Sequence, residues 1–219
     1  LRVFESYGFS GLGVRTATTE QFGSVPSLLA ASPCAFSKEL CELPVIEYLK
    51  VGMLPTAPLV NELANWLEQR PGVCVVHDPV RYSSTGLALA SPESFLEQRK
   101  RLLPLASVIT PNAREAAELA DVPVPTNKAE AAEVAARLFE RMRGDAIVVI
   151  TGVNSENGVA DTVLTKDGVT FLGCPLVRAE KRGTGCRYSS TLLCALAAEL
   201  PLMEALSRAQ AMVVAYLRA

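Results

Sequence analysis

The sequence predicts an α/β fold built around a mostly parallel sheet. Short runs rich in β-branched residues alternate with longer helical runs along the chain, which is the order expected of right-handed βαβ units. Two short runs, "GVCVVHDPV" at 72–80 and "DAIVVITG" at 145–152, are almost continuously apolar, as strands buried on both faces are. With 49% apolar and 20% charged residues, the chain can form a sizeable core, and wholesale disorder is excluded.

The elements of the first half are predicted in order. We expect helices at 1–8, 37–44, 57–70 and 93–103, and strands at 13–21, 47–52, 72–80 and 106–110. The strand at 13–21 is indicated by β-branched and small residues, and the strand at 47–52 ends in Gly52. The helix at 57–70 has apolar residues at Leu59, Leu63, Trp66 and Leu67, the spacing of an amphipathic helix.

The second half continues this alternation. Helices are predicted at 112–120 and 128–142, followed by the buried strand at 145–152. Residues 158–174 have the pattern of a β-hairpin, with Lys166, Asp167 and Gly168 at the turn. Two closing helices start near Thr184 and Leu202. Since no repeat, low-complexity segment or linker interrupts the chain, we expect one domain over residues 1–219.

Composition excludes several classes of function. A net charge of −2 argues against a nucleic-acid surface, which needs clustered basic residues. The six cysteines are scattered without a CxxC pair, which favours reduced thiols and a cytoplasmic protein. His77 is the only histidine, so most zinc sites are excluded. The longest apolar run, "TLLCALAAELPL", is interrupted by Glu199 and is too short to span a membrane.

Polar or conformationally permissive residues follow the predicted strands. They are Gln21, Gly52 and Met53, Asp78, Pro111 and Asn112, and Thr151 and Gly152. In open sheets of this kind, ligands bind at the carboxyl ends of the strands. We therefore expect these residues to surround a site.

The tetrapeptide "GTGC" at 183–186 begins the first closing helix. Gly183 and Gly185 allow unusual backbone angles, so that N–H groups at a helix start can converge on an anion. Cys186 would lie in the positive potential of the helix start, which favours a thiolate. From the tetrapeptide alone, an anion cradle and a simple glycine turn with a buried thiol are equally good interpretations.

Three further residues have a functional and a structural interpretation. Asp78 could bind Mg²⁺, or "DP" could simply begin a turn. Glu115 could organise the same metal through its hydration shell, or form a capping box with Asn112. His77 is expected to be packed or hydrogen-bonded near the sheet rather than catalytic. Each signal is weak in isolation, and their order along the chain gives them weight.

The ordered series "KVGML" (50–54), "DPV" (78–80), "TPNAREAAEL" (110–119) and "GTGC" (183–186) resembles the hydroxymethylpyrimidine/phosphomethylpyrimidine kinases of thiamine biosynthesis. These kinases belong to the ribokinase-like superfamily, and the resemblance extends from residue 1 to residue 219. It implies a three-layer α/β/α sandwich. "GTGC" is the most discriminating motif, because related sugar kinases usually have aspartate at the position of Cys186.

The resemblance implies specific roles in an ATP- and Mg²⁺-dependent phosphoryl transfer. Gly183, Thr184 and Gly185 would form the anion hole, and Cys186 would be the general base, with its pKa lowered by the helix start. The other implied roles are Mg²⁺ organisation by Asp78 and Glu115, pyrimidine contacts by Gln21, Met53 and Val80, and nucleotide contacts by Asn112, Thr151 and Gly152. The implied partners are a small-molecule substrate and a second copy in a homodimer, with no nucleic acid and no membrane.

The chain also departs from the family pattern. The family's N-terminal strand, its glycine-rich substrate loop and its C-terminal tail have no counterpart in the sequence, and Thr151 stands where members often have a lysine. Two alternatives therefore remain: a pyridoxal/pyridoxine kinase of the same superfamily, and a non-catalytic pyrimidine-binding paralogue. A redox role for Cys186 and Cys194 is disfavoured, because eight helical residues separate them by about 12 Å.

Overall fold

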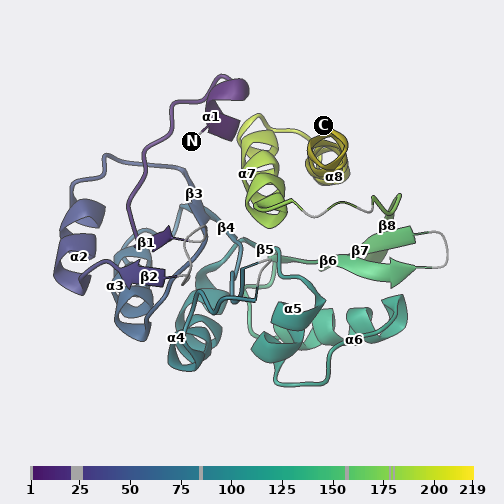
Figure 1. The fold of residues 1–219 in the computed structure, drawn as a ribbon, viewed down its shortest axis with the longest axis horizontal. Helices are drawn as coiled ribbons and strands as arrows, with labels where there is room; N and C mark the ends of the chain where they lie inside the picture. Colours follow the sequence, from purple (N-terminus) through teal and green to yellow (C-terminus); the bar gives the residue numbers. More distant parts are fainter. Residues whose placement is uncertain (1, 21–26, 84–85, 156–157, 178, 180) are drawn as a thin grey trace.

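A six-stranded sheet lies at the centre of the fold (Figure 1), and the predicted mostly parallel sheet is confirmed. The computed structural model describes residues 2–20, 27–83, 86–155, 158–177, 179 and 181–219. The sheet has the order β3 (Tyr48–Val51), β4 (Cys74–His77), β5 (Val108–Ile109), β6 (Ile147–Ser155), β7 (Gly158–Thr165) and β8 (Gly168–Cys174). Strands β3 to β6 are parallel, whereas β7 and β8 form the predicted antiparallel hairpin.

Helices cover both faces of this sheet (Figure 1). One face carries α1 (Arg2–Ser6), α7 (Thr184–Ala197) and α8 (Leu202–Arg218), and the other carries α3 (Ala57–Glu68), α4 (Pro92–Glu97), α5 (Ala113–Ala120) and α6 (Lys128–Phe139). Helix α2 (Pro33–Cys41) lies beside α3 at the β3 end of the sheet. The three-layer α/β/α arrangement is therefore confirmed, and the two closing helices begin at the predicted residues.

Side-chain alternation assigns neighbouring strand residues to opposite layers. Leu49 and Val51 of β3 belong to the apolar core that includes α3. Lys50 lies between them in sequence and contacts α7 instead, where Cys186 is its partner. In the parallel register Lys50 is opposite Val76, which packs with α7 residues in a separate core. The sheet thus places one lysine on its α7 face.

Two segments differ from the predicted elements. The strand expected at 13–21 is β1 (Ala17–Glu20), which pairs with β2 (Ser27–Ala30) in a separate antiparallel ribbon and does not enter the central sheet. The helix expected at 93–103 is α4 followed by a π-helical turn (Gln98–Leu102) and a 3-10 turn (Leu103–Leu105). Pro104 accounts for the 3-10 turn at the end of this segment, because proline lacks the N–H that a continuing α-helix would need there.

Within the described residues, β3 and β8 form the two edges of the six-stranded sheet. All six cysteines are free thiols. None of the helices in the described ranges is long and apolar enough to cross a membrane.

Candidate active site

The carboxyl ends of the parallel strands form a continuous edge. The amide of Asp78 donates to the Val51 carbonyl at 2.8 Å, and the amide of Thr151 donates to the Pro111 carbonyl at 2.9 Å. These bonds align the ends of β3, β4 and β5 with Thr151, which lies inside β6 where its pairing with β7 is interrupted. The predicted end of this strand at Thr151 and Gly152 is therefore wrong, because β6 continues to Ser155. Gln21 lies outside the described residues.

The "GTGC" segment forms the start of α7. Gly183 is the N-cap residue and has a left-handed backbone with φ of 80°, which explains the glycine. Gly185 lies within the helix and is not in the positive-φ region, so the predicted unusual backbone at this residue is wrong. A β-carbon at residue 185 would lie 3.6 Å from Asp78 Oδ1. A methyl group there would be in van der Waals contact with the Asp78 carboxylate.

No side chain among the described residues caps the first turn of α7. Helix N-termini have backbone N–H groups without intrahelical partners, and these groups together with the helix dipole favour an anion. The start of α7 thus has the chemical character of the predicted anion cradle.

Asp78 is buried and lies between the sheet and α7. Its Oδ2 atom is 3.3 Å from the Lys50 ammonium and accepts a 3.1 Å hydrogen bond from the Ser189 hydroxyl. Burial alone would lower the pKa of Lys50, but the adjacent Asp78 and Cys186 raise it above its usual value. Lys50 is therefore a partly buried cation held between a carboxylate and a thiol.

Cys186 is exposed, and its Sγ atom lies 3.8 Å from Lys50 Nζ. The surrounding protein atoms raise the pKa of the thiol by desolvating its anion; the Lys50 charge opposes this effect, and Asp78 adds to it. The net shift is upward. The prediction of a pKa lowered by the helix start is therefore wrong for the protein alone, because desolvation outweighs the favourable charges.

A cavity of about 630 Å³ lies beside Cys186. One wall is a single face of α7, formed by Cys186, Ser190, Leu193, Cys194 and Ala197. Lys50 and Met53 of the β3 edge also line this cavity, but Val80 does not. The structure thus brings Met53 and Cys186 to one space, which is large enough for a small ring.

A smaller cavity of about 190 Å³ lies on the other side of the α7 start. Thr151 and Gly152 line it together with Thr184 and Gly185. Because Gly185 borders this cavity and Cys186 borders the larger one, the start of α7 lies between two spaces. Two reactants could therefore approach it from opposite sides.

Asp161, which sequence reasoning missed, holds Gly152 of β6 in place. Asp161 accepts hydrogen bonds from the Gly152 amide at 3.0 Å, the Tyr188 hydroxyl at 2.8 Å and the Gln210 side chain at 2.9 Å. These bonds join Gly152, which has a left-handed φ of 69°, to α7 and α8. Desolvation raises the pKa of Asp161, and the three donors oppose the rise.

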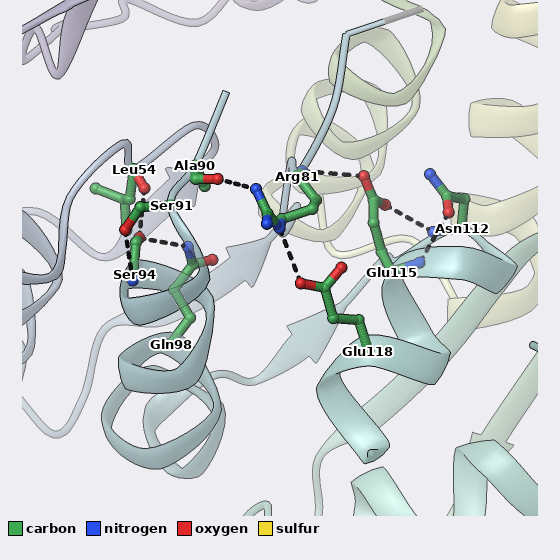
Figure 2. Close-up of polar contacts among 9 residues, drawn as sticks. All are labelled: Leu54, Arg81, Ala90, Ser91, Ser94, Gln98, Asn112, Glu115 and Glu118. Atoms are coloured by element: carbon green, nitrogen blue, oxygen red, sulfur yellow. Dashed lines mark hydrogen bonds and ion pairs between the residues drawn. The ribbon is translucent and has the colours of Figure 1, made fainter. Parts of the chain in front are cut away.

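Glu115 connects two of the strand-end segments (Figure 2). Its Oε2 accepts from the Asn112 amide at 3.0 Å, and its Oε1 accepts from the Arg81 amide at 3.2 Å. Asn112 Oδ1 in turn accepts from the Glu115 amide, so the predicted capping box is confirmed. Burial raises the pKa of Glu115 to about 7, and the charge of Asp78 contributes to the rise.

The loop after Asp78 is fixed further by the Arg81 side chain (Figure 2). Its guanidinium is 2.8 Å from Glu118 Oε1 and also donates to the Ala90 carbonyl. Both Asp78 and Arg81 are buried. A rigid loop therefore holds Asp78 at the sheet edge.

His77, next to Asp78, has the predicted structural role. Its Nε2 atom is hydrogen-bonded to the side-chain oxygen Oε1 of Gln98 at 3.1 Å. Burial lowers the pKa of the imidazole to about 4. Gln98 donates to Ser94, whose hydroxyl donates to the Leu54 carbonyl at 2.6 Å (Figure 2). This buried chain fixes the β3 loop, which contains Met53, relative to the end of β4.

Comparison with known proteins agrees with this geometry. The family model described as phosphomethylpyrimidine kinase matches residues 1–219. The chain is 33% identical over 218 residues to a hydroxymethylpyrimidine/phosphomethylpyrimidine kinase of Rhizobium meliloti (strain 1021), with 96% of this chain and 80% of the relative covered. It is 32% identical over 197 residues to the kinase of the same name from Escherichia coli (strain K12), with 88% and 74% covered.

Solved structures show the same fold. The phosphomethylpyrimidine kinase of Clostridium difficile 630 aligns with a TM-score of 0.82 at 22% identity, covering 98% of this chain and 90% of that chain. The pyridoxal kinase of Staphylococcus aureus in complex with pyridoxal aligns with a TM-score of 0.86 at 21% identity, covering 99% and 80%. Both likenesses confirm the ribokinase-like architecture. Given the match over its whole length, the chain belongs to the phosphomethylpyrimidine kinase family and is a kinase.

Proposed function

We propose that this kinase transfers the γ-phosphoryl group of ATP to the hydroxymethyl oxygen of 4-amino-5-hydroxymethyl-2-methylpyrimidine, and then phosphorylates the resulting monophosphate. The observation that carries the proposal is the position of Cys186 at the uncapped start of α7, between the larger cavity and the smaller one. The relatives in R. meliloti and E. coli carry the name of this activity.

The pyrimidine would occupy the part of the larger cavity that borders Cys186 and Met53. A thioether packs well against an aromatic ring, and Met53 is held in place through the Leu54 carbonyl and Ser94. Gln21 and Val80 are further proposed pyrimidine contacts. Of the two, Gln21 is outside the described residues, and Val80 does not border the cavity.

The transferred phosphoryl group would lie at the start of α7. Backbone N–H groups of Gly183, Thr184 and Gly185 would stabilise the negative charge on its oxygens, which is the principal contribution of protein groups to phosphoryl transfer. Cys186 would accept the proton of the substrate hydroxyl as general base. Because its pKa lies above the usual value, the favourable charge of Lys50 is important for this role.

A magnesium ion fits the chemistry of Asp78 and Glu115. Both are buried carboxylates whose charges interact, and Mg²⁺ is commonly bound by one or two carboxylates together with phosphate oxygens and water. Both Glu115 oxygens already accept backbone hydrogen bonds, which favours contact through water. When bound, the ion would supply positive charge to the nucleotide phosphates.

The nucleotide would lie on the side of the smaller cavity, near Asn112, Thr151 and Gly152. The Gly152 amide already donates to Asp161, and the amide and hydroxyl of Thr151 donate to the Pro111 carbonyl. A phosphate contact at either residue would therefore replace one of these bonds. The proposal also includes a homodimer in the cytoplasm, which size-exclusion chromatography with light scattering and cell fractionation would test.

A coupled assay of ADP release tests the function. The purified kinase is supplied with ATP, Mg²⁺ and the pyrimidine alcohol, its monophosphate or pyridoxal, and kcat/KM is compared. We expect the pyrimidine alcohol to give the highest value and the monophosphate to be turned over. Equal or higher efficiency with pyridoxal would show a pyridoxal kinase, and pyrimidine binding without ADP release would show a non-catalytic binding protein.

A further inference from the structure

Lys50 lies at the centre of the proposed site, although no role was predicted for it from the sequence. Its ammonium is 3.8 Å from Cys186 Sγ and 3.3 Å from Asp78 Oδ2. Only 15% of its side chain is exposed. A lysine is rarely buried to this extent unless it is paired, and both partners of Lys50 belong to the proposed site. The contacts with Cys186 and Asp78 therefore explain why Lys50 occupies this partly buried position.

The chain leaves room for this ammonium at Gly52. A β-carbon at residue 52 would lie only 2.6 Å from Lys50 Nζ, which is closer than any such contact can be. Gly52 does not have a positive φ, so its backbone conformation does not require glycine. Alanine at residue 52 would therefore displace the Lys50 ammonium, whereas glycine leaves room for it.

The ammonium has hydrogen-bonding capacity beyond its two partners. A lysine ammonium carries three N–H donors, and the contacts to Asp78 and Cys186 account for two of them. Within the described part of the chain the third donor has no partner, so it can reach an oxygen atom close to Sγ. If Cys186 receives a proton from the substrate hydroxyl, the oxygens around the reacting centre are those of the phosphoryl group and the substrate alcohol.

We propose that Lys50 is a catalytic residue that contacts the transferred phosphoryl group and neutralises charge on it during transfer. This inference rests on the proposed kinase reaction. In that step the bond between the γ-phosphorus and the bridging oxygen of ADP breaks, the bond from the substrate oxygen to phosphorus forms, and the hydroxyl proton passes to the Cys186 thiolate. Lys50 reaches Cys186 in the first turn of α7 from β3, so a phosphoryl group bound at this helix start would be close to both the ammonium and the N–H groups of the helix.

Three variants test this role. Lys50→Met removes the charge and keeps the length of the side chain, Lys50→Arg keeps the charge, and Gly52→Ala displaces the ammonium. Lys166→Met, in the exposed hairpin turn, is the matched control. For Lys50→Met we expect kcat to fall by about 10²–10³-fold, the loss typical of one donor to a transition-state anion, while KM for ATP and for the pyrimidine change by less than about threefold.

The remaining variants separate a catalytic from a structural role. Lys50→Arg should recover at least about tenfold of the lost kcat, Gly52→Ala should lower kcat without a comparable loss of melting temperature, and Lys166→Met should match wild type. Calorimetry should show that Lys50→Met binds AMP-PCP with unchanged affinity. The proposal is overturned if kcat of Lys50→Met is within threefold of wild type. It is also overturned if Lys50→Arg loses as much kcat as Lys50→Met, or if the loss of kcat in the variants is proportional to their loss of melting temperature. If wild type itself does not turn over the pyrimidine, the proposed function fails first, and the role of Lys50 fails with it.

Discussion

The carboxylate of Asp78 lies against Gly185, which is the second residue of α7. A β-carbon at residue 185 would lie 3.6 Å from Oδ1 and 3.8 Å from Oδ2 of Asp78. The two glycines of "GTGC" therefore differ: Gly183 has a left-handed backbone that favours glycine, whereas a methyl group at residue 185 would fit in van der Waals contact with the Asp78 carboxylate. This difference can be measured.

Gly185→Ala should keep or increase stability and lower activity. Alanine stabilises a helix by up to about 1 kcal/mol relative to glycine, and the backbone at residue 185 does not have a positive φ. The added methyl group restricts the space through which Asp78 would reach a metal or phosphate. Urea unfolding and steady-state kinetics check both parts, and a lower stability with full activity would contradict this explanation.

Gly183→Ala, in contrast, should lower the free energy of unfolding. The new β-carbon would meet no atom within 4 Å, but φ of 80° is unfavourable for alanine and costs about 1–2 kcal/mol. We expect a lower urea midpoint with an unchanged slope. An unfolding free energy equal to that of wild type would show that the start of α7 relaxes freely.

Cys186→Ala should abolish most turnover and leave pyrimidine binding nearly intact. A positioned general base contributes about 10²–10⁴-fold to a rate, and the side chain forms only one edge of the larger cavity. Cys34→Ala, an exposed thiol, is the control. We would measure kcat by ADP release and pyrimidine affinity by calorimetry; near-wild-type kcat would remove Cys186 from the mechanism.

Glu115 should make stability fall as the pH rises. The pKa of its buried carboxyl is raised from 4.5 to about 7, so between these values the folded protein binds more protons than the unfolded chain. The unfolding free energy contributed by this group therefore decreases by up to about 3 kcal/mol from acid to neutral pH. His77, whose pKa is lowered to about 4, contributes the opposite slope below pH 6.5. The direction of the Glu115 contribution is therefore read from the difference between wild type and Glu115→Gln, measured by urea unfolding from pH 4.5 to 8.

Glu115→Gln should remove this contribution and leave the opposite slope of His77, because an amide does not titrate. The exposed Glu133→Gln on α6 is the control and should retain the Glu115 contribution. An unchanged slope in Glu115→Gln would assign the pH dependence to another group.

Tyr188→Phe should destabilise the kinase by about 1–3 kcal/mol, the usual effect of leaving a buried charged acceptor with one fewer donor. The Tyr188 hydroxyl donates to Asp161 at 2.8 Å, and both residues are buried. Tyr7→Phe is the control, since the Tyr7 hydroxyl makes no hydrogen bond within the described part of the chain. Equal urea midpoints for the two variants would argue against the Asp161 network.

The sequence predicted those features that local pattern determines. The amphipathic spacing of residues 57–70, the hairpin at 158–174 and the capping box of Asn112 and Glu115 each depend on residues close together in the chain, and all are present. Strand β2 was missed because "SLLA" has no β-branched residue to distinguish it. Its partner β1 has the expected composition, but composition does not reveal which sheet a strand joins.

The parts of the site that were missed depend on distant contacts. Lys50 lies in a short strand segment, "YLKV", and only the position of α7 shows that its ammonium meets Cys186, 136 residues later. Asp161 lies in a hairpin strand away from every motif, and its three donors come from β6, α7 and α8. The pKa of Cys186 was predicted in the wrong direction because desolvation depends on the packed protein around the thiol.

The long separation between Lys50 and Cys186 has a consequence for how the kinase folds. Parallel strands pair segments that are far apart in the chain, and such high contact order slows folding. The ribosome delivers β3 to β6 before α7, so Lys50, Asp78 and Glu115 are synthesised before Cys186. The proposed reactive centre therefore cannot be complete until α7 has been synthesised, and a nascent chain that ends at β6 has no Cys186 with which to catalyse the transfer.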